Sequence, residues 1–309
     1  MTNTRPDPRC HRAFGSSEQQ YDSPLVTEPQ VLHHRNVEIL RGSHLATQVR
    51  ERLTRVFLSV SVLMDILHNI LMGVRPLAWL AQRYHSTGVN ADTEMVRRVF
   101  QLYSRFVSVK ANDILEIGPG HTMEVLAQAM MEGARSCTAI DVIDYRASRQ
   151  GTVQPIRCIV YGGKELPFEA ERFDVVWSYT AFEHLRYPEV TVLECFRVLR
   201  RGGMFVSLID LGDHSCYGKS KLCPGMAFDC LRYPDWLWSL MRWNRSSYVN
   251  RLRQSDWLCL FEKAGFVLRA KETTVSEDTI RLLPNLGYLQ QYDYEDAVTS
   301  VMTVCFEKP

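Results

Sequence analysis

From residue 112 onward, short apolar runs alternate with segments of helical periodicity. The runs predict five strands, at 112–117, 136–141, 155–161, 173–178 and 203–209. Several are apolar throughout, which is typical of strands buried on both faces of a parallel sheet. Helices are predicted at 122–133, 188–200 and 254–264, followed by strands at 266–272 and 301–307. This alternation predicts an α/β fold with a doubly wound sheet over residues 109–309.

The first 108 residues follow a different pattern. Residues 1–44 show little periodicity and contain four prolines, so we expect a flexible arm. Residues 45–108 are predicted to be an N-terminal helical extension, broken near Pro76 because proline lacks the amide that a helix interior needs. We expect this extension to act as a lid over the functional site.

The stretch 56–73 is apolar enough to need a test for membrane insertion. Asp65 interrupts it, and an aspartate at the centre of a bilayer costs about 2.5–3.5 kcal/mol, which argues against a transmembrane span. Its apolar residues recur at steps of four and three, at Val56, Val60, Leu63, Leu67 and Ile70. We therefore expect an amphipathic helix whose apolar face is packed, either in the lid or in a homodimer contact.

Composition narrows the class of partner. Lys and Arg total 36 against 35 for Asp and Glu, so the chain lacks the excess positive charge of a general nucleic-acid binder. Nine cysteines without a CxxC pair, together with the absence of a secretory pattern in the first forty residues, predict a cytoplasmic location. Cys216, Cys223 and Cys230 recur near His214, but structural zinc ligands usually come in closer pairs, and no metal is expected.

The sharpest motif is the run Asp113-Ile-Leu-Glu-Ile-Gly-Pro-Gly120. A buried strand ends in two glycines just before a predicted helix, so the backbone is able to turn tightly and approach a ligand. Asp141 ends the next predicted strand, where an acid binds ribose hydroxyls in nucleotide-binding folds. An ordinary glycine turn is the alternative. A nicotinamide site is less favoured, because Met123 stands where GxGxxG has its last glycine.

Three further segments follow in order: Leu166-Pro-Phe168, then ERFDVVWSYTAFEHL, then ECFRVLRRGGMFV. With the glycine motif, they make the chain resemble the class I S-adenosylmethionine (SAM)-dependent methyltransferases. The resemblance covers residues 110–210 well and the rest more loosely. It implies a Rossmann-like, seven-stranded sheet with its last strand antiparallel, a helical insertion after strand five, and SAM as the cofactor.

The resemblance also implies cofactor contacts at matched positions. These are Glu116 near the methionine amino group, Gly118 and Gly120 along the methionine and ribose, Asp141 on both ribose hydroxyls, Val142 on adenine, Glu165 and Leu166 at the adenine edge, and Ser178 at the methionine portion. Gly162 stands where many relatives have an aspartate for the adenine amine, so this contact is in question. Arg201 replaces the usual proline at a turn.

The acceptor is expected beyond the carboxyl ends of strands four and five. His184 is the first candidate general base, and His214 with Asp213 is the second. His184 is alternatively a helix-start histidine oriented by Glu183. Tyr179 is a candidate to face the sulfonium, or else a buried aromatic whose hydroxyl is bonded. Relatives that methylate quinone precursors hold a metal with E-x-x-E-H, but Thr180 replaces the first glutamate.

Residues 217–253 form the predicted insertion, rich in aromatic and basic residues. It is either a cover for the core or a lid that shapes the acceptor pocket, with arginines available for a carboxylate or phosphate. The resulting hypothesis is methyl transfer from SAM to a small-molecule metabolite. The alternatives are cyclisation of the aminobutyrate arm of SAM with release of methylthioadenosine, and SAM binding without turnover.

Overall fold

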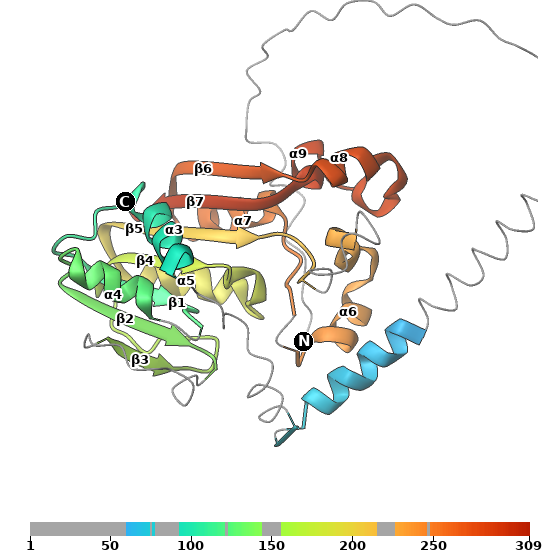
Figure 1. Ribbon diagram of the computed structural model, residues 1–309, viewed down its shortest axis with the longest axis horizontal. Coiled ribbons are helices and arrows are strands. Elements are labelled where there is room, and N and C mark those ends of the chain that lie inside the picture. The colour runs from blue at the N-terminus through green and yellow to red at the C-terminus, as the bar shows by residue number, and fades with distance from the viewer. Residues whose placement is uncertain are drawn as a thin grey trace, which may run out of the picture.

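The sheet has seven strands and confirms the predicted fold class (Figure 1). The computed structural model describes residues 60–74, 76–77, 93–120, 123–143, 156–214, 226–245 and 248–309. The strands are β1 (Asp113–Ile117), β2 (Ser136–Asp141), β3 (Arg157–Val160), β4 (Phe173–Tyr179), β5 (Leu199–Asp210), β6 (Val267–Val275) and β7 (Thr299–Glu307). Their order is β3-β2-β1-β4-β5-β7-β6, and β7 is antiparallel to both neighbours.

The central strands are buried on both faces, as their apolar sequences predict. All five residues of β1 are buried, and so are the last five of β2. β1 pairs in parallel with β2 on one side and β4 on the other. The ends of these strands, at Ile117, Asp141 and Tyr179, therefore lie at the same edge of the sheet.

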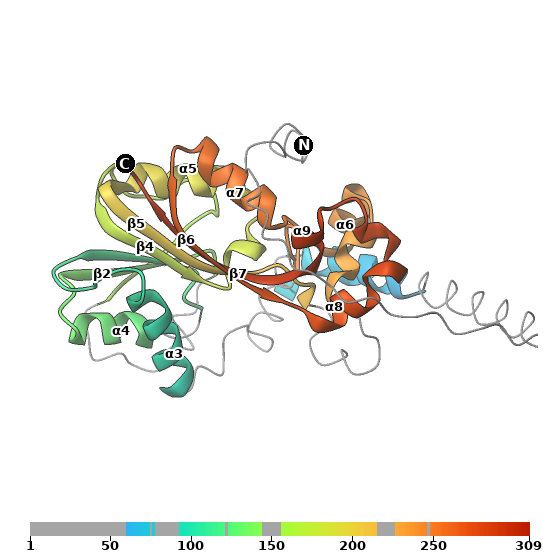
Figure 2. The same ribbon diagram turned by 90° about the horizontal axis from the view of Figure 1, so that it is seen from above.

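Helices cover the two faces of the sheet in separate layers (Figure 2). On one face lie α3 (Thr93–Ser104) and α4 (Glu124–Met131), where Tyr103 stacks on Trp177 with ring centroids 4.3 Å apart. On the other lie α5 (Pro188–Val198) and α7 (Gln254–Lys263), which enclose an aromatic core that includes Phe261. Both layers leave the carboxyl edge of β1 and β2 accessible.

β5 begins at Leu199, earlier than the predicted start at 203. The predicted helix 188–200 correspondingly ends at Val198. Leu199 leaves the helical conformation, with ψ 141°, and pairs with Phe173 of β4. Sheet pairing therefore overrides the helical periodicity in these last residues.

The insertion packs against a helical segment that the sequence pattern did not predict. The described part of the insertion holds η5 (Met226–Arg232) and α6 (Asp235–Arg242). Between β6 and β7 lie α8 (Glu277–Leu282), η6 (Leu283–Asn285), η7 (Gly287–Leu289) and α9 (Tyr294–Val298). Phe228, Trp238 and Leu289 join the two segments in one buried cluster. The local signal is Ser276, whose hydroxyl accepts a hydrogen bond from the Thr279 amide and caps α8.

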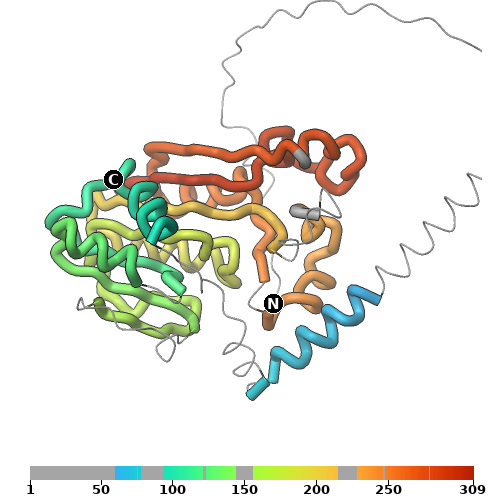
Figure 3. The backbone as a smooth tube through the Cα atoms, viewed as in Figure 1, coloured from blue at the N-terminus to red at the C-terminus, as the bar shows by residue number. Residues whose placement is uncertain are grey.

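Residues 60–72 form a helix beside α6 (Figures 1 and 3). Its polar side makes the contact, because Asp65 accepts hydrogen bonds from Arg242 and Arg245, and the Asn69 side chain donates to the carbonyl of Leu240. Within the described residues of the chain this apolar face is not packed, since it is exposed at Val60, Leu63, Leu67 and Ile70, and its packing in a homodimer contact stays a prediction.

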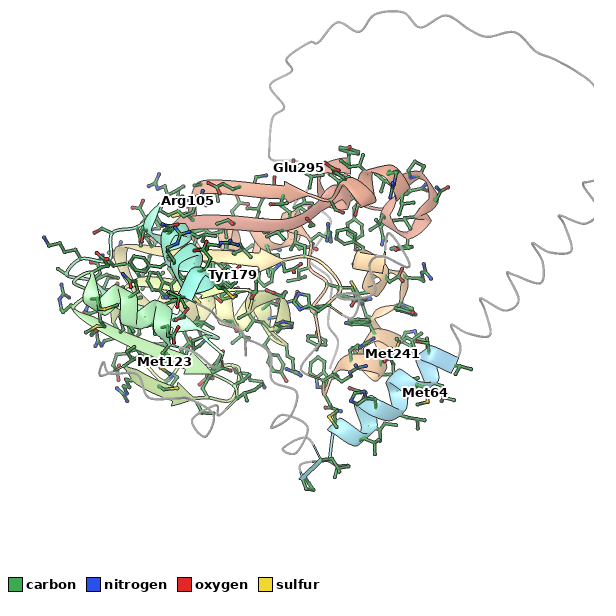
Figure 4. The ribbon with its side chains drawn as sticks, viewed as in Figure 1. Met64, Arg105, Met123, Tyr179, Met241 and Glu295 are labelled. Carbon is green, nitrogen blue, oxygen red and sulfur yellow. The ribbon has the colours of Figure 1, made fainter. Side chains whose placement is uncertain are left out.

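Two methionines, one on each helix, differ in their exposure to solvent. Figure 4 shows Met64 on the outer side of the helix, where it is 60% exposed, whereas Met241 of α6 is buried. No helix within the described ranges is long and apolar enough to cross a membrane. The predicted arm at 1–44, and the parts of the helical extension at 45–59 and 78–92, lie outside the described residues.

Candidate active site

A cavity of about 550 Å³ lies at the carboxyl ends of β1, β2 and β4. It occurs where the chain order of the strands reverses, between β1 and β4, which is the usual ligand site of doubly wound sheets. Its size is within the range of pockets that enclose a small organic ligand. Of the residues predicted for the site, Glu116, Gly118, Gly120, Asp141, Val142, Tyr179, His184 and His214 line this cavity.

The glycine turn after β1 brings backbone close to the cavity. Gly118 and Gly120 have positive φ angles of 72° and 67°. Residues other than glycine adopt this backbone conformation only at an energetic cost. A Cβ added to Gly118 would lie 2.5 Å from the Cβ of Ala181. Glycine is therefore required at position 118, both for the turn and for the approach of the chain that follows β4.

Asp141 fixes this turn from the end of β2. Its carboxylate accepts hydrogen bonds from the amide of Gly120 at 3.2 Å and from the amide of Ile143 at 3.0 Å. The side chain is buried but borders the cavity. The carboxylate is thus held in a fixed orientation by backbone before any ligand binds. Val142, next to it, lines the cavity with its side chain 47% exposed.

Glu116 is an unusual group for the middle of a buried strand. It is 4% exposed, and its Oε2 has no hydrogen-bond partner among the described residues. Burial, with a smaller contribution from the charge of Asp141, raises the pKa of Glu116 to about 8. A cationic amine in the cavity would supply the missing partner, so this residue fits the amino group of a bound amino-acid moiety.

The other three predicted cofactor residues are not among those that line the cavity. Leu166 is buried, and its amide donates to Glu194, while Glu165 is exposed. Ser178 is fully buried, and its hydroxyl donates to the carbonyl of Ile117, which ties β4 to β1. Gly162 does line the cavity, and a Cβ there would meet nothing within 4 Å.

Two histidines lie together in the lining of the cavity. His184 ends η3 (Phe182–His184), and His214 follows β5. Their ring centroids are 4.7 Å apart. Nδ1 of His184 lies 2.6 Å from the carbonyl oxygen of Tyr248. Because a carbonyl only accepts, Nδ1 carries the hydrogen and Nε2 of the neutral ring keeps its lone pair.

The electrostatic surroundings keep His184 neutral. Burial, reinforced by His214, lowers the pKa of His184 to about 4. Glu183 is also buried, and burial raises the pKa of its carboxyl well above the usual value. Two carboxylates approach Nε2 of His214, that of Asp210 at 3.3 Å and that of Glu183 at 3.8 Å.

Asp213, expected beside His214, is buried and is not among the residues that line the cavity. Burial is the main cause that lowers the pKa of Arg245, and the charge of Asp213 makes a small opposing contribution. Tyr179 borders the cavity from the end of β4, close to α3 in Figure 4. Burial raises the pKa of its hydroxyl above the usual value.

The insertion contributes to the cavity through Asn244 rather than through its arginines. Arg242 and Arg245 bind Asp65, and Arg251 binds Asp235, so these charges already have partners. Sequence reasoning missed Arg186, which lines the cavity and donates from Nε to the carbonyl of Trp243. The only signal for it was its position just after His184.

A large part of the cavity lining belongs to a segment that matches a known family. Residues 115–207 match the family described as "Methyltransferase domain". A curated relative, "tRNA U34 carboxymethyltransferase" of Cellvibrio japonicus, is 28% identical over 152 residues, which are 45% of this chain and 45% of that protein. The chain thus matches less than half the length of this relative.

Solved structures resemble this chain at low sequence identity. A structure titled "S-adenosylmethionine dependent methyltransferase from Mesorhizobium loti" is 17% identical to this chain, with a TM-score of 0.46. The match covers 71% of this chain and 100% of that chain. The PH0226 protein of Pyrococcus horikoshii is 14% identical, with a TM-score of 0.48, over 74% of this chain and 98% of that one.

Proposed function

We propose that this chain, which carries a methyltransferase domain of the class I SAM-dependent family, transfers a methyl group to a small-molecule metabolite. SAM is the cofactor of this domain, and it supplies an electrophilic methyl group on a sulfonium. One observation carries the proposal: the glycine turn with Asp141 and the histidine pair border the same cavity, so cofactor and acceptor would meet inside it.

The residues divide into a cofactor end and an acceptor end. At the first, Asp141 would bind the ribose hydroxyls, Glu116 the amino group, and the glycine turn would lie along the bound molecule. At the second, His184 and His214 would hold the nucleophilic atom of the acceptor and promote loss of its proton. Enclosure of both ends in one cavity supports this arrangement, because an in-line displacement depends on the two reactants being held in position.

A small molecule is favoured over tRNA, which the name of the curated relative raises as an acceptor. Lys and Arg exceed Asp and Glu by one residue, 36 against 35. A tRNA-binding surface needs several phosphate contacts and hence a local excess of positive charge. Arg242, Arg245 and Arg251 of the insertion are paired with carboxylates. A cytoplasmic location and a homodimer remain predictions.

The assay that tests this function identifies the nucleoside product by mass spectrometry. Purified protein is incubated with SAM alone, with SAM and a protein-free metabolite extract, and with SAM and bulk tRNA. We expect S-adenosylhomocysteine only with the extract. Formation of methylthioadenosine from SAM alone would show that the protein cyclises SAM instead of transferring its methyl group. Methylated tRNA would show that the acceptor is tRNA and not a small molecule. Tight SAM binding with no product in any arm would indicate a binding module.

SAM binding is expected to release a proton from Glu116. Since the pKa of this carboxyl is about 8 in the free protein, it is protonated at pH 6, whereas an ammonium partner favours its ionised form. Affinity should therefore rise with pH, by up to about tenfold per unit between about pH 6 and pH 7.5. Calorimetry in two buffers of different ionisation enthalpy measures the released proton.

The Glu116→Gln variant is the control for this proton release. Glutamine keeps the size of the side chain but has no titrating proton, so SAM binding should be weaker and lose its dependence on pH. An equal dependence of SAM affinity on pH in the variant and in the unchanged protein would show that another group releases the proton.

A further inference from the structure

We propose that Glu183, His184 and His214 form a binding site for one divalent transition-metal ion at the acceptor end of the cavity. This inference deepens the proposed function, on which it rests for the role of the ion, because the ion would hold the acceptor. The sequence motif alone argued against a metal, since Thr180 replaces a glutamate. The fold supplies a ligand from elsewhere, His214, which follows β5.

The first observation is the state of the Glu183 carboxylate. The side chain is 2% exposed, and neither of its oxygens accepts a well-formed hydrogen bond from the described residues, although the backbone amides of Glu183 and Asp210 face it. A buried carboxylate without well-formed hydrogen bonds or a cation is costly, and such groups often mark a missing ion. The two histidines are the groups that lie with it in the cluster, and a shared cation would stabilise all three.

The second observation is the spacing of the donor atoms. One ligand atom from each of the three residues lies within 4.8 Å of the other two, and Oε1 of Glu183 is 3.8 Å from Nε2 of His214. Ligands bound to zinc at about 2.0–2.1 Å in a tetrahedral site are roughly 3.4 Å apart. Small rotations of these side chains would therefore bring them to coordination distance.

The third observation is the bond that orients His184. Metal-binding histidines usually donate their second ring hydrogen to a carbonyl or carboxylate, which fixes the ring and leaves the other nitrogen for the metal. Nδ1 of His184 makes this bond to the carbonyl of Tyr248, 2.6 Å away. Asp210, with Oδ2 3.3 Å from Nε2 of His214, places a second carboxylate beside the cluster.

The set of donors indicates the kind of ion and its use. Two imidazoles and one carboxylate suit Zn²⁺, Fe²⁺ or Mn²⁺ better than Mg²⁺, which prefers oxygen ligands. His184 and His214 border the cavity, so the remaining coordination positions would face the acceptor. A hydroxyl oxygen bound there would lose its proton to solvent more readily and become the nucleophile. The site therefore favours acceptors that present a hydroxyl to be methylated.

The test uses the full chain, purified without a histidine tag and treated with a chelator, and titrates it with Zn²⁺ by calorimetry. We expect one ion per chain and a loss of affinity of at least about 100-fold in Glu183→Gln, His184→Gln and His214→Gln, since each removes one of three ligands. His68→Gln, at an exposed histidine of the helix 60–72, is the matched control and should bind Zn²⁺ as the unchanged protein does.

SAM affinity, measured on the same variants, reports whether the fold is intact, because the cofactor end uses other residues. Absence of Zn²⁺ binding by the unchanged protein would overturn the inference, and so would binding that is equal in His68→Gln and all three cluster variants. Methyl transfer by a metal-free protein would leave the proposed function standing and remove the ion from it. Binding of Zn²⁺ at the cluster without methyl transfer in any assay would support the metal site and contradict the proposed function.

Discussion

Replacement of Asp141 by alanine is expected to weaken SAM binding by at least about 100-fold. Each hydrogen bond to a charged group contributes about 1.5–3 kcal/mol, and two bonds to the ribose would be lost. The carboxylate also accepts from the amides of Gly120 and Ile143, so the alanine variant loosens the turn against which the cofactor would lie. Calorimetry with SAM and with S-adenosylhomocysteine measures the loss.

Two further variants separate these contributions. Asp141→Asn keeps one acceptor oxygen and the volume, so it should retain part of the affinity that alanine loses. Glu132→Gln, at an exposed glutamate that follows α4, removes one negative charge far from the cavity and should bind SAM normally. If Asp141→Ala binds as tightly as Glu132→Gln, the carboxyl-edge cavity is not the SAM site.

Arg253→Ala is expected to lower the free energy of unfolding by about 3–5 kcal/mol, because a buried side chain with several hydrogen bonds is removed. The guanidinium is fully buried and donates to the carbonyls of Leu211, Asp296 and Thr299. Its carbon Cζ also lies 4.7 Å from the centroid of the Phe228 ring. One side chain thus joins the end of β5, the α9–β7 junction and the insertion.

Urea-induced unfolding measures this effect, with Arg98→Ala as the control. Arg98 pairs with Glu94 on the exposed side of α3, with its own side chain 73% exposed. A pair of this kind contributes about 0–1 kcal/mol, so the control should unfold almost as the unchanged protein does. If Arg253→Ala proves too unstable to purify, Arg253→Lys should show a smaller loss in the same direction. Equal stability of the Arg253 and Arg98 variants would contradict the proposed linkage.

The position of the cavity residues that end or follow β1 and β2 was predictable because its signals are local in the sequence. Gly118 and Gly120 follow a buried strand directly, and Asp141 ends the next one. Parallel pairing of β1 with β2 then brings the two strand ends together without any further information. The same holds for the order of strands and helices, which follows from apolar runs and their spacing.

Residues whose position depends on distant packing were not predictable in this way. Ser178 was placed at the cofactor from its position after strand four, but alternation along β4 turns it away from the side of Trp177 and Tyr179. The approach of His214 to Glu183 depends on how the chain leaves β5 and meets η3. No spacing in the sequence encodes this approach.

The contacts of the helix 60–72 also depend on packing against a distant segment. Its apolar positions have helical spacing, which predicts a buried face, yet the described contacts come from Asp65 and Asn69. The amide of Asn244 donates to the Asn69 side chain at 2.7 Å, and the Asn244 side chain donates to the Asn69 backbone. Such paired hydrogen bonds depend on the partner segment, so periodicity alone does not reveal them.

The carbonyl of Tyr248 that holds His184 belongs to the insertion, whereas Gly118, Gly120 and Asp141 belong to the sheet. Under the proposed function, the insertion therefore orients one residue of the acceptor end, whereas the sheet supplies the residues of the cofactor end. A change in the described part of the insertion would then be expected to alter acceptor choice more than SAM binding. Chimeras that graft this stretch from one relative onto another are the corresponding route to altered substrate choice.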